Sequence, residues 1–444
     1  MAGINDLLNK AVAECLPTQA EEEKLKLKLD EFLQKLKQAA KNNKINAEIM
    51  LGGSAAKGTF LKKDFDVDVF VRFNYDYKEK DLSEMLETIL KKISSLKFVR
   101  LHGSRDYFQA KYKGIYYEII PVLYVTEPKK AMNVTDMSPL HVAWLKTHLN
   151  DNKHNDNKLN NNKINNNKLN ENKSLRKEIL LAKLFCKAQG CYGAESYIQG
   201  FSGHVLDILI VNYGSFLNLL KSSQKWKQFD VIDVEKHGTA DKLNQSKISP
   251  LLLIDPLQPD RNAAAALSTE KFELFKQKAK EFLANPSPDF FVKKEYSLKD
   301  LKKLKTSSAS ARLIILTIKA LEGKEDIVGA KLLKSYTHIL KHLQLGGFTV
   351  TTSGWKWDKA KKAEFWFVVK ESQLSDTTLR MGPPVKETRS VEAFKAKHPN
   401  AFVKDNRLYA NVKRQFRTPE DLIKALIKDE YITEKMDSIK LKLF

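Results

Sequence analysis

The sequence predicts a multidomain α+β protein. Its 444 residues suffice for two to four domains with separate cores, and a hydrophobic content of 42% is ordinary for globular domains. A mixed α/β pattern over the first part changes to mostly helical periodicity and then to alternating strands and helices. We therefore expect a first domain at residues 1–140, a mostly helical central domain at 141–268, and an α/β C-terminal body and tail at 269–444.

The first domain should open with a helix whose start is marked in the sequence. Thr18 is an N-cap residue and Glu21, three positions later, completes a capping box. Apolar residues then recur at helical spacing as far as about Lys41. Further along, we expect another helix at 82–97 and strands at 45–50, from Asp66 onward, at 107–112 and at 116–124, the last two forming a hairpin across Lys113-Gly114.

The central domain is interrupted by a low-complexity repeat. Residues 150–174 repeat an Asn/Lys-rich pentapeptide, a period that suits neither a helix nor a strand. A pentapeptide solenoid of about one coil would be too short to stack, so we predict a disordered surface insertion. The strongly apolar helical pattern begins at Leu175.

The C-terminal third reads as α/β units. We expect strands at 311–316, 347–350 and 364–369 and a helix at 328–342. Sheets rich in basic and aromatic residues suit RNA binding.

The charge points to a polyanionic partner. The formal net charge is +22 and the pI is about 9.5, which favours nucleic acid or an anionic membrane. The most apolar segment, Ile208 to Leu220, is shorter than the roughly 20 residues of a span and is interrupted by polar residues, so we expect no membrane partner. The start lacks a signal-peptide layout, and the cysteines lack metal spacing, which fits a reducing cytoplasm.

Arginine is concentrated in the tail. Five of the eleven arginines lie between Arg380 and Arg417, with aromatic residues between them. Arginine binds phosphates bidentately and stacks on bases, whereas the simpler alternative is a solvated face. We predict RNA contacts from Arg380, Arg407, Arg414 and Arg417.

The strongest chemical signal is a pair of carboxylates near a glycine turn. Asp66 and Asp68 are two residues apart at the head of an apolar strand, so both side chains lie on one face. Two like charges there repel each other unless a divalent metal such as Mg²⁺ lies between them. The upstream turn at Gly53-Ser54 lets backbone N–H groups approach phosphates. This combination indicates a polymerase-type nucleotidyltransferase.

Two-metal nucleotidyl transfer normally needs a third carboxylate on a neighbouring strand. Glu118, in the predicted 116–124 strand, is the best candidate. Asp64 shares the face of Asp66 and Asp68, so the pair could also be Asp64 and Asp66. We prefer Asp66 and Asp68 because the apolar part of the strand begins directly after them. Paired aspartates alone are more often a solvated strand edge.

Further blocks of sequence carry a family resemblance. They are Ser138-Pro139-Leu140-His141, Tyr192-Gly193-Ala194-Glu195, Gly200-Phe201-Ser202-Gly203, Asp255-Pro256 with Arg261-Asn262-Ala263-Ala264, and Arg380-Met381-Gly382-Pro383. Their order resembles that of the archaeal class I CCA-adding enzymes, the tRNA nucleotidyltransferases, over nearly the whole chain. The central block is specific to that family, whereas the Gly-Ser and paired-Asp motif is shared with poly(A) polymerases and oligoadenylate synthetases.

The resemblance implies a polymerase-β-like nucleotidyltransferase head and a Mg²⁺-dependent activity. That activity is template-independent addition or repair of the 3′-terminal CCA of tRNA from CTP and ATP, with release of pyrophosphate. The expected partners are tRNA, CTP and ATP, with a homodimer as a candidate assembly that the sequence alone does not set. One alternative is a related poly(A) polymerase or oligoadenylate synthase. Another is a catalytically inactive RNA-binding protein, which the two intact aspartates and the candidate third carboxylate argue against.

The resemblance also implies roles for individual residues. Gly53 and Ser54 would approach the triphosphate, with Lys57 where the family often has arginine. Asp66, Asp68 and Glu118 would bind metal, although the third position is usually aspartate in the family. His141, Lys183, Tyr192 and Arg261 match positions that line the nucleotide pocket. Among these, Lys183 would contact phosphate, Tyr192 sugar or phosphate, and Arg261 the base edge. Without the resemblance, all four read as ordinary surface or core residues.

Overall fold

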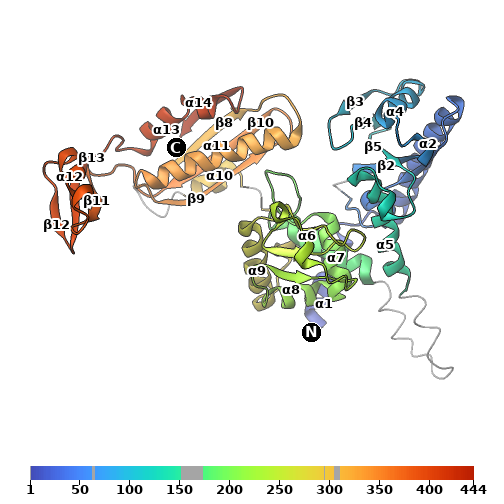
Figure 1. The fold of residues 1–444 in the computed structure, drawn as a ribbon, viewed down its shortest axis with the longest axis horizontal. Helices are drawn as coiled ribbons and strands as arrows, with labels where there is room; N and C mark the ends of the chain where they lie inside the picture. Colours follow the sequence, from blue (N-terminus) through green and yellow to red (C-terminus); the bar gives the residue numbers. More distant parts are fainter. Residues whose placement is uncertain (1, 63–65, 152–173, 295, 305–310) are drawn as a thin grey trace. The chain divides into compact units, whose positions relative to one another are not determined.

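The computed structural model describes residues 2–62, 66–151, 174–294, 296–304 and 311–444 (Figure 1). The chain divides into two compact units, Met1–Lys294 and Glu295–Phe444. The expected three-domain division, with boundaries near residues 140 and 268, stays a prediction. The predicted disordered repeat falls almost wholly in 152–173, outside the described residues.

The first unit begins with α1 (Ala2–Ala13) and α2 (Gln19–Asn42). The predicted capping box at the start of α2 is confirmed, because Thr18 accepts from the Glu21 backbone and the Glu21 carboxylate accepts from the Thr18 N–H at 2.8 Å. Helix α1 was not predicted. Its Leu8 and Val12 belong to the core of the helical part of this unit rather than to that of the sheet described next.

A five-stranded sheet follows, in the order β1-β2-β5-β4-β3. Strands β2 and β5 are parallel and the other pairs are antiparallel. The predicted hairpin of β4 and β5 across Lys113-Gly114 is confirmed, and both turn residues have positive φ angles of 48° and 83°. The strand bounds are β1 (Ala47–Leu51), β2 (Asp66–Phe73), β3 (Phe98–Leu101), β4 (Tyr107–Tyr112) and β5 (Ile115–Leu123).

Helices α2 and α4 (Leu82–Lys91) cover one face of this sheet. Val67, Val69 and Val71 of β2 are fully buried against them. Because side chains alternate along a strand, Asp66 and Asp68 lie on the opposite face. Helix α4 ends six residues before the predicted Lys97, and the left-handed φ of 65° at Ser95 excludes a helix that continues to Lys97.

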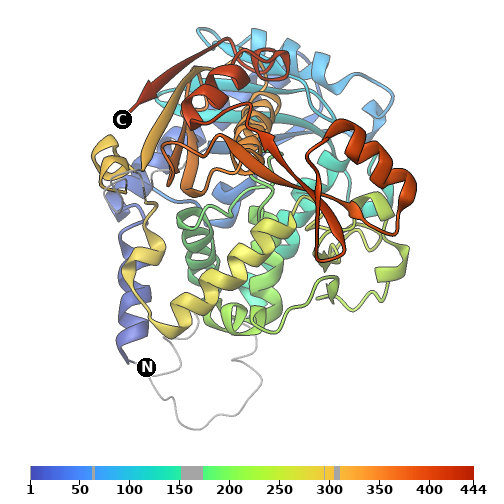
Figure 2. The same ribbon diagram turned by 90° about the vertical axis from the view of Figure 1, so that its left-hand side faces the viewer.

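The rest of the first unit is mostly helical (Figure 2). Phenylalanines from three of its helices, Phe185, Phe216, Phe275 and Phe282, pack together in its core. The elements are α3 (Gly53–Lys57), α5 (Ser138–Asp151), α6 (Ser174–Ala188), α7 (Gly203–Tyr213), α8 (Phe216–Ser223), α9 (Thr269–Ala284) and the parallel pair β6 (Asp230–Ile232) and β7 (Leu251–Leu253). Short 3₁₀ turns lie at Tyr75–Tyr77, Pro128–Lys130, Val134–Met137 (η3), Ala240–Lys242, Gln245–Lys247 and Pro288–Phe291.

Within the described residues, no single helix is long and apolar enough to cross a membrane. The pair α7 and α8 passes that test together by length and composition, but the two helices bend by 92° at the break between them.

The second unit contains a four-stranded antiparallel sheet in the order β14-β8-β10-β9. Helix α11 lies along one face (Figure 1), and Leu301 of α10 packs on the other face against Trp366. The tail contains a second, three-stranded sheet in the order β11-β13-β12. The bounds are α10 (Leu298–Leu304), β8 (Arg312–Lys319), α11 (Glu325–Leu345), β9 (Val350–Trp357), β10 (Lys362–Val369), β11 (Thr377–Pro384), α12 (Thr388–Lys397), β12 (Phe402–Lys404), β13 (Arg407–Lys413), α13 (Pro419–Leu426), α14 (Glu430–Thr433) and β14 (Ser438–Leu443).

In this unit β8, β10 and α11 lie where the sequence predicted them, within a few residues at each end. The strand predicted at 347–350 is wrong except for its last residue. Gly346 and Gly347 end α11, and Gly347 has a φ of 91°, so β9 begins only at Val350.

Candidate active site

Three predicted metal ligands meet on the open face of the N-terminal sheet. Parallel pairing places Asp68 of β2 opposite Glu118 of β5, and Asp66 lies two residues earlier on the same face of β2. Residues paired in adjacent strands point to the same side of a sheet, so the carboxylates form one group. Gln109 of β4 donates from Nε2 to Glu118 Oε1 at 2.8 Å and orients that carboxylate. Asp64, the alternative member of the pair, lies outside the described residues.

The electrostatics of this group favour a bound cation. Burial, and then the neighbouring Glu118, raise the pKa of Asp68 from 3.8 to about 7. The positive charges of Lys57 and Lys183 oppose that rise, whereas Asp66 adds to it. A divalent ion among these oxygens would favour the ionised carboxylates, and carboxylate oxygen is the ligand that Mg²⁺ prefers in proteins. The donor set therefore fits the predicted metal.

The glycine turn next to Asp68 is tightly packed. Gly53 has a φ of 48°, and a Cβ atom at this position would lie 1.6 Å from Asp68 Oδ2. The Gly52 N–H donates to the Asp68 carbonyl at 2.8 Å, which joins the turn to β2. Only glycine fits position 53 with Asp68 in this conformation. Ser54 follows Gly53 in the single-turn helix α3.

A cleft of about 310 Å³ opens beside this turn. Five predicted site residues line it, namely Gly53, Lys57, Asp68, His141 and Arg261. Apolar and small residues of β2, β5, η3 and α5 form the rest of the wall, together with His204 of α7. The cleft thus brings residues separated by about 200 positions in the sequence to one place.

Two buried lysines lie at the cleft: Lys57 lines it, whereas Lys183 does not. Lys57 forms an ion pair with Asp207 of α7, with Nζ 2.6 Å from Oδ2. Lys183 of α6 is only 4% exposed and donates to the carbonyl and the hydroxyl of Thr59 at 3.1 and 3.0 Å. Burial lowers the pKa of Lys183. Asp207 was missed by the sequence analysis, although a lone acidic residue in an otherwise apolar helix was a signal for it.

Tyr192 lies close to Lys183. A Cβ atom added to Gly203 would be 3.0 Å from the Tyr192 hydroxyl and 3.8 Å from Lys183 Nζ, so both side chains reach the first residue of α7. Burial raises the pKa of Tyr192, which keeps its hydroxyl protonated. Ser54, Asp66, Glu118, Lys183 and Tyr192 are not among the residues that line the cleft in this conformation.

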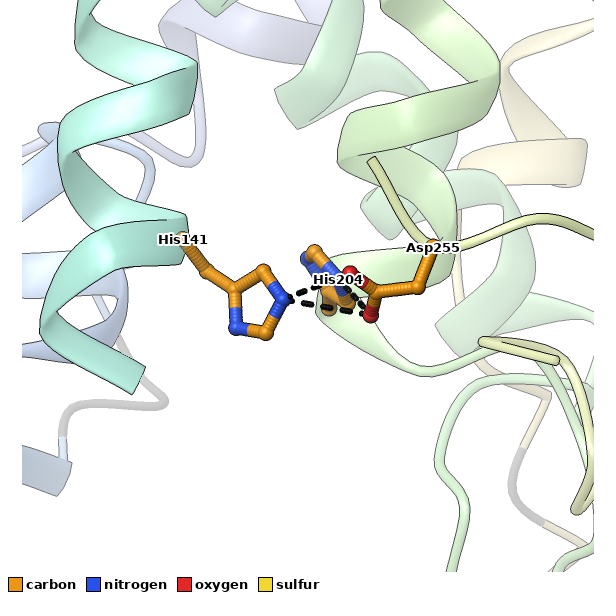
Figure 3. Close-up of side chains that lie close together, drawn as sticks. All are labelled: His141, His204 and Asp255. Carbon is orange, nitrogen blue, oxygen red and sulfur yellow. Dashed lines mark hydrogen bonds and ion pairs between the residues drawn. The ribbon is translucent and has the colours of Figure 1, made fainter. Parts of the chain in front are cut away.

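A second cluster surrounds Asp255 (Figure 3). His141 Nε2 lies 2.9 Å from Asp255 Oδ1, His204 Nε2 lies 3.3 Å from Oδ2, and Arg261 Nη1 lies 2.6 Å from Oδ2. Burial alone would raise the pKa of Asp255, but hydrogen bonds from His141 and His204 hold it well below its usual range. Burial lowers the pKa of His204.

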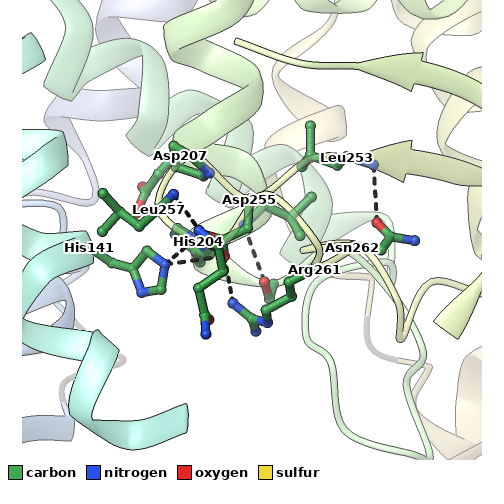
Figure 4. A network of polar contacts seen from close by, with 12 residues as sticks. His141, His204, Asp207, Leu253, Asp255, Leu257, Arg261 and Asn262 are labelled. Carbon is green, nitrogen blue, oxygen red and sulfur yellow. Dashed lines mark hydrogen bonds and ion pairs between the residues drawn. The ribbon is translucent and has the colours of Figure 1, made fainter. Parts of the chain in front are cut away.

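The loop that carries Arg261 is itself fixed (Figure 4). Asn262 is 3% exposed, and its Oδ1 accepts from the backbone N–H groups of Leu253 and Ala264, both at 3.0 Å. From the sequence, Asp255 was named only as part of a block that carries the family resemblance, and His204 had no predicted role. Neither residue stands out by spacing, because their partners are distant in the sequence.

The four tail arginines differ in their surroundings. Arg380 of β11 is exposed, while Arg407 of β13 contacts Met381 Sδ at 3.2 Å. Arg414 donates to the Gly346 carbonyl at 2.9 Å, and Arg417 pairs with Asp376 at 2.6 Å. Their contact with RNA stays a prediction, and Arg414 already serves a structural contact at the end of α11.

Sequence comparisons match three successive parts of the chain. A nucleotidyltransferase domain model matches residues 29–136, the model of the tRNA nucleotidyltransferase second domain matches 177–292, and the model of the CCA-adding enzyme C-terminal domain matches 310–435. A CCA-adding enzyme of Nanoarchaeum equitans is 34% identical over 83% of this chain and 84% of its own length. One from Methanocaldococcus jannaschii is 30% identical over 96% of this chain and 91% of its own. Among solved structures, the Cid1 poly(U) polymerase aligns with 65% of this chain and 98% of its own at 11% identity and a TM-score of 0.48.

Proposed function

The chain belongs to the family of CCA-adding enzymes, which are tRNA nucleotidyltransferases, and on that premise we propose that it builds or repairs the 3′-terminal CCA of tRNA. The nucleotides would be CTP and ATP, added without a nucleic-acid template, with release of pyrophosphate at each step. A related poly(A) polymerase or oligoadenylate synthase would not use CTP.

The observation that carries this proposal is the register of β2 and β5. It groups Asp66, Asp68 and Glu118 next to a cleft whose size suits a nucleotide. These residues would hold Mg²⁺, which would supply a lowered pKa for the attacking RNA hydroxyl and charge stabilisation for the leaving pyrophosphate. Glu118 is one methylene longer than the family's aspartate, and a hydrogen bond from Gln109 orients its carboxylate.

The remaining groups would hold the nucleotide. The close packing of Gly53 against Asp68 brings the backbone of the turn near the carboxylates, where a triphosphate would lie. Lys57 and Lys183 supply positive charge on that side, and the protonated hydroxyl of Tyr192 can donate a hydrogen bond. Arg261, which also lines the cleft, would offer the donors of its guanidinium to a base edge.

The partner would be tRNA, bound mainly through phosphates and shape. An enzyme that serves all tRNAs cannot read their individual sequences, and a net charge of +22 suits a polyanion. Exposed Arg380 in the tail sheet is a candidate contact. A cytoplasmic location and a homodimer are also part of this proposal.

A primer-extension assay tests the proposal directly. Purified full-length protein would be incubated with Mg²⁺, a tRNA transcript lacking CCA, and each nucleoside triphosphate alone or in combination. We expect two additions with CTP alone, one further addition when ATP is also present, and none with UTP or GTP. A ladder of A residues without use of CTP would favour the poly(A) alternative, and no extension of any tRNA would refute the proposed activity.

A further inference from the structure

Asp255 is a fully buried carboxylate that contacts His141 of α5 and His204 of α7, two helices that contribute to the cleft wall. Its own turn fixes its position, because Oδ1 accepts from the backbone N–H groups of Leu257 and Gln258 at 3.0 and 3.2 Å. Asp255 does not line the cleft, whereas its partners His141, His204 and Arg261 all do. It can therefore act on a bound molecule only through those three side chains.

The contacts determine how two of these partners are presented. A carboxylate held ionised has only acceptors, so His141 must carry a proton on Nε2, the nitrogen 2.9 Å from Oδ1. Figure 3 shows Nδ1 on the side of the ring turned away from Asp255. One arm of the Arg261 guanidinium is held at 2.6 Å, which leaves its other donors for the cleft.

A metal ion is the alternative reading of this cluster. The ligand atoms of His141, His204 and Asp255 lie within 4.8 Å of one another. However, Asp255 already meets the Arg261 cation and accepts from five groups in all, whereas a carboxylate offers about four lone-pair sites. Hydrogen bonding therefore accounts for the geometry without a metal.

We propose that Asp255 is a positioning residue for the incoming nucleotide, which holds His141 and Arg261 in the orientation that CTP and ATP require. The inference rests on the proposed function, since it takes this cleft as the nucleotide site. It adds a residue that acts through others, joining α5 to the loop before Asn262, to those expected to touch the nucleotide.

The test compares Asp255→Asn with a matched control in the full-length protein. Asp233 also accepts a turn N–H, from Gly238 at 2.8 Å, but Gly238 does not line the cleft as the partners of Asp255 do, so Asp233→Asn is the control. ATP and CTP affinity would be measured by equilibrium dialysis with Mg²⁺, and KM and kcat on tRNA lacking CCA. We expect Asp255→Asn to weaken both affinities and raise both KM values by about 10- to 100-fold, with a smaller change in kcat, because small misplacements at a site can cost about a hundredfold. Asp233→Asn should change none of them.

Because Asp255 is buried, its variant could also lose stability. Arg261→Lys breaks the same contact from the cleft side, and the double variant completes a cycle. If Asp255 acts through Arg261, the double variant should bind nucleotide only slightly more weakly than the weaker of the two single variants. If the fold-losses in affinity of the two single variants multiply in the double variant, the two residues act independently and the inference is refuted. Unchanged nucleotide affinity in Asp255→Asn would overturn the inference, as would one equivalent of tightly bound zinc that is lost in His204→Ala.

The two proposals can fail separately. If the wild-type protein binds ATP and CTP and Asp255→Asn does not, but tRNA is never extended, the positioning role stands and the proposed function falls. If the wild-type protein and Asp255→Asn extend tRNA equally well at low nucleotide concentration, the proposed function stands and the positioning role of Asp255 falls.

Discussion

Lys57 Nζ lies 2.6 Å from Asp207 Oδ2, and both side chains are almost completely buried. Lys57 ends α3, which follows the glycine turn, and Asp207 lies in the middle of α7. The ion pair therefore connects the sheet that carries the carboxylates to the helical part of the same unit. Asp207 Oδ1 has no hydrogen-bond partner among the described residues, so this buried carboxylate depends on the contact of Oδ2 with Lys57.

Removal of Asp207 should destabilise the first unit strongly. Asp207→Ala removes the carboxylate that forms an ion pair with the buried Lys57 ammonium, and breaking a buried pair in this way typically costs about 3–5 kcal/mol. Urea unfolding followed by far-UV circular dichroism would measure the loss. Glu127→Ala, which breaks the exposed pair with Lys130, is the control and should change the unfolding free energy by less than about 1 kcal/mol. Equal effects of the two substitutions would mean that the Lys57 pair is solvated.

Gly53→Ala should abolish nucleotide addition while the protein stays folded. The new Cβ atom would lie 1.6 Å from Asp68 Oδ2, so Asp68 or the turn must move. Gly114→Ala is a matched control, because Gly114 also has a positive φ, 83°, but no atom within 4 Å of its Cβ position. Both variants carry backbone strain of roughly 1 kcal/mol, yet only Gly53→Ala should lose more than about 100-fold in kcat/KM in the primer assay. Comparable losses in both would show that strain, rather than the clash with Asp68, is responsible.

The sequence predicted local structure well where a pattern lies within a few residues. The capping box at Thr18, the hairpin turn at Lys113-Gly114 and the two-residue spacing of Asp66 and Asp68 are all local signals, and the structure has each of them. The grouping of the carboxylates could be expected only in outline, because the register of β2 with β5 depends on a crossover of more than 40 residues.

The Asp255 and Asp207 contacts could not be predicted from the sequence. The partners of Asp255 include His141, 114 positions earlier, and those of Asp207 include Lys57, 150 positions earlier. Contacts between residues so far apart in the sequence leave no periodic pattern from which they could be predicted. The tail sheet was missed for a different reason: β11 and β12 are largely exposed and lack a clear alternation of apolar residues, and only β13 alternates.

Asp68→Asn and Asp66→Asn should each abolish addition without a large loss of tRNA affinity. Both substitutions keep the shape of the side chain and remove the charge that would hold Mg²⁺. Primer extension gives the activity, and filter binding gives the tRNA affinity, which should stay within about threefold because RNA is expected to bind largely through phosphate contacts elsewhere. Near-normal turnover in either variant would place the metal site somewhere else.

Glu118 allows a finer test of the same site. Glu118→Asp restores the family's residue and should retain activity, since a carboxylate remains opposite Asp68. Glu118→Gln should be as inactive as Asp68→Asn. Because Gln109 orients the Glu118 carboxylate, Gln109→Ala should lower kcat several-fold. A fully active Glu118→Gln would show that the third ligand is a different residue, and Gln109→Ala should then leave kcat unchanged.

The tail arginines should separate into RNA-binding and structural residues. Each phosphate contact that is lost should reduce the slope of log affinity against log salt by about one unit. Arg380 is exposed, so Arg380→Ala should lower tRNA affinity for different tRNAs about equally and flatten this slope, with little change in Tm. Arg414 donates to the Gly346 carbonyl at the end of α11, so Arg414→Ala should instead lower the Tm by several degrees and leave the slope unchanged. Binding titrations at several salt concentrations, with thermal melts of the same preparations, measure both quantities. If Arg414→Ala flattens the slope and Arg380→Ala does not, the RNA contacts the tail on the side of Arg414 and breaks its bond to Gly346 when it binds.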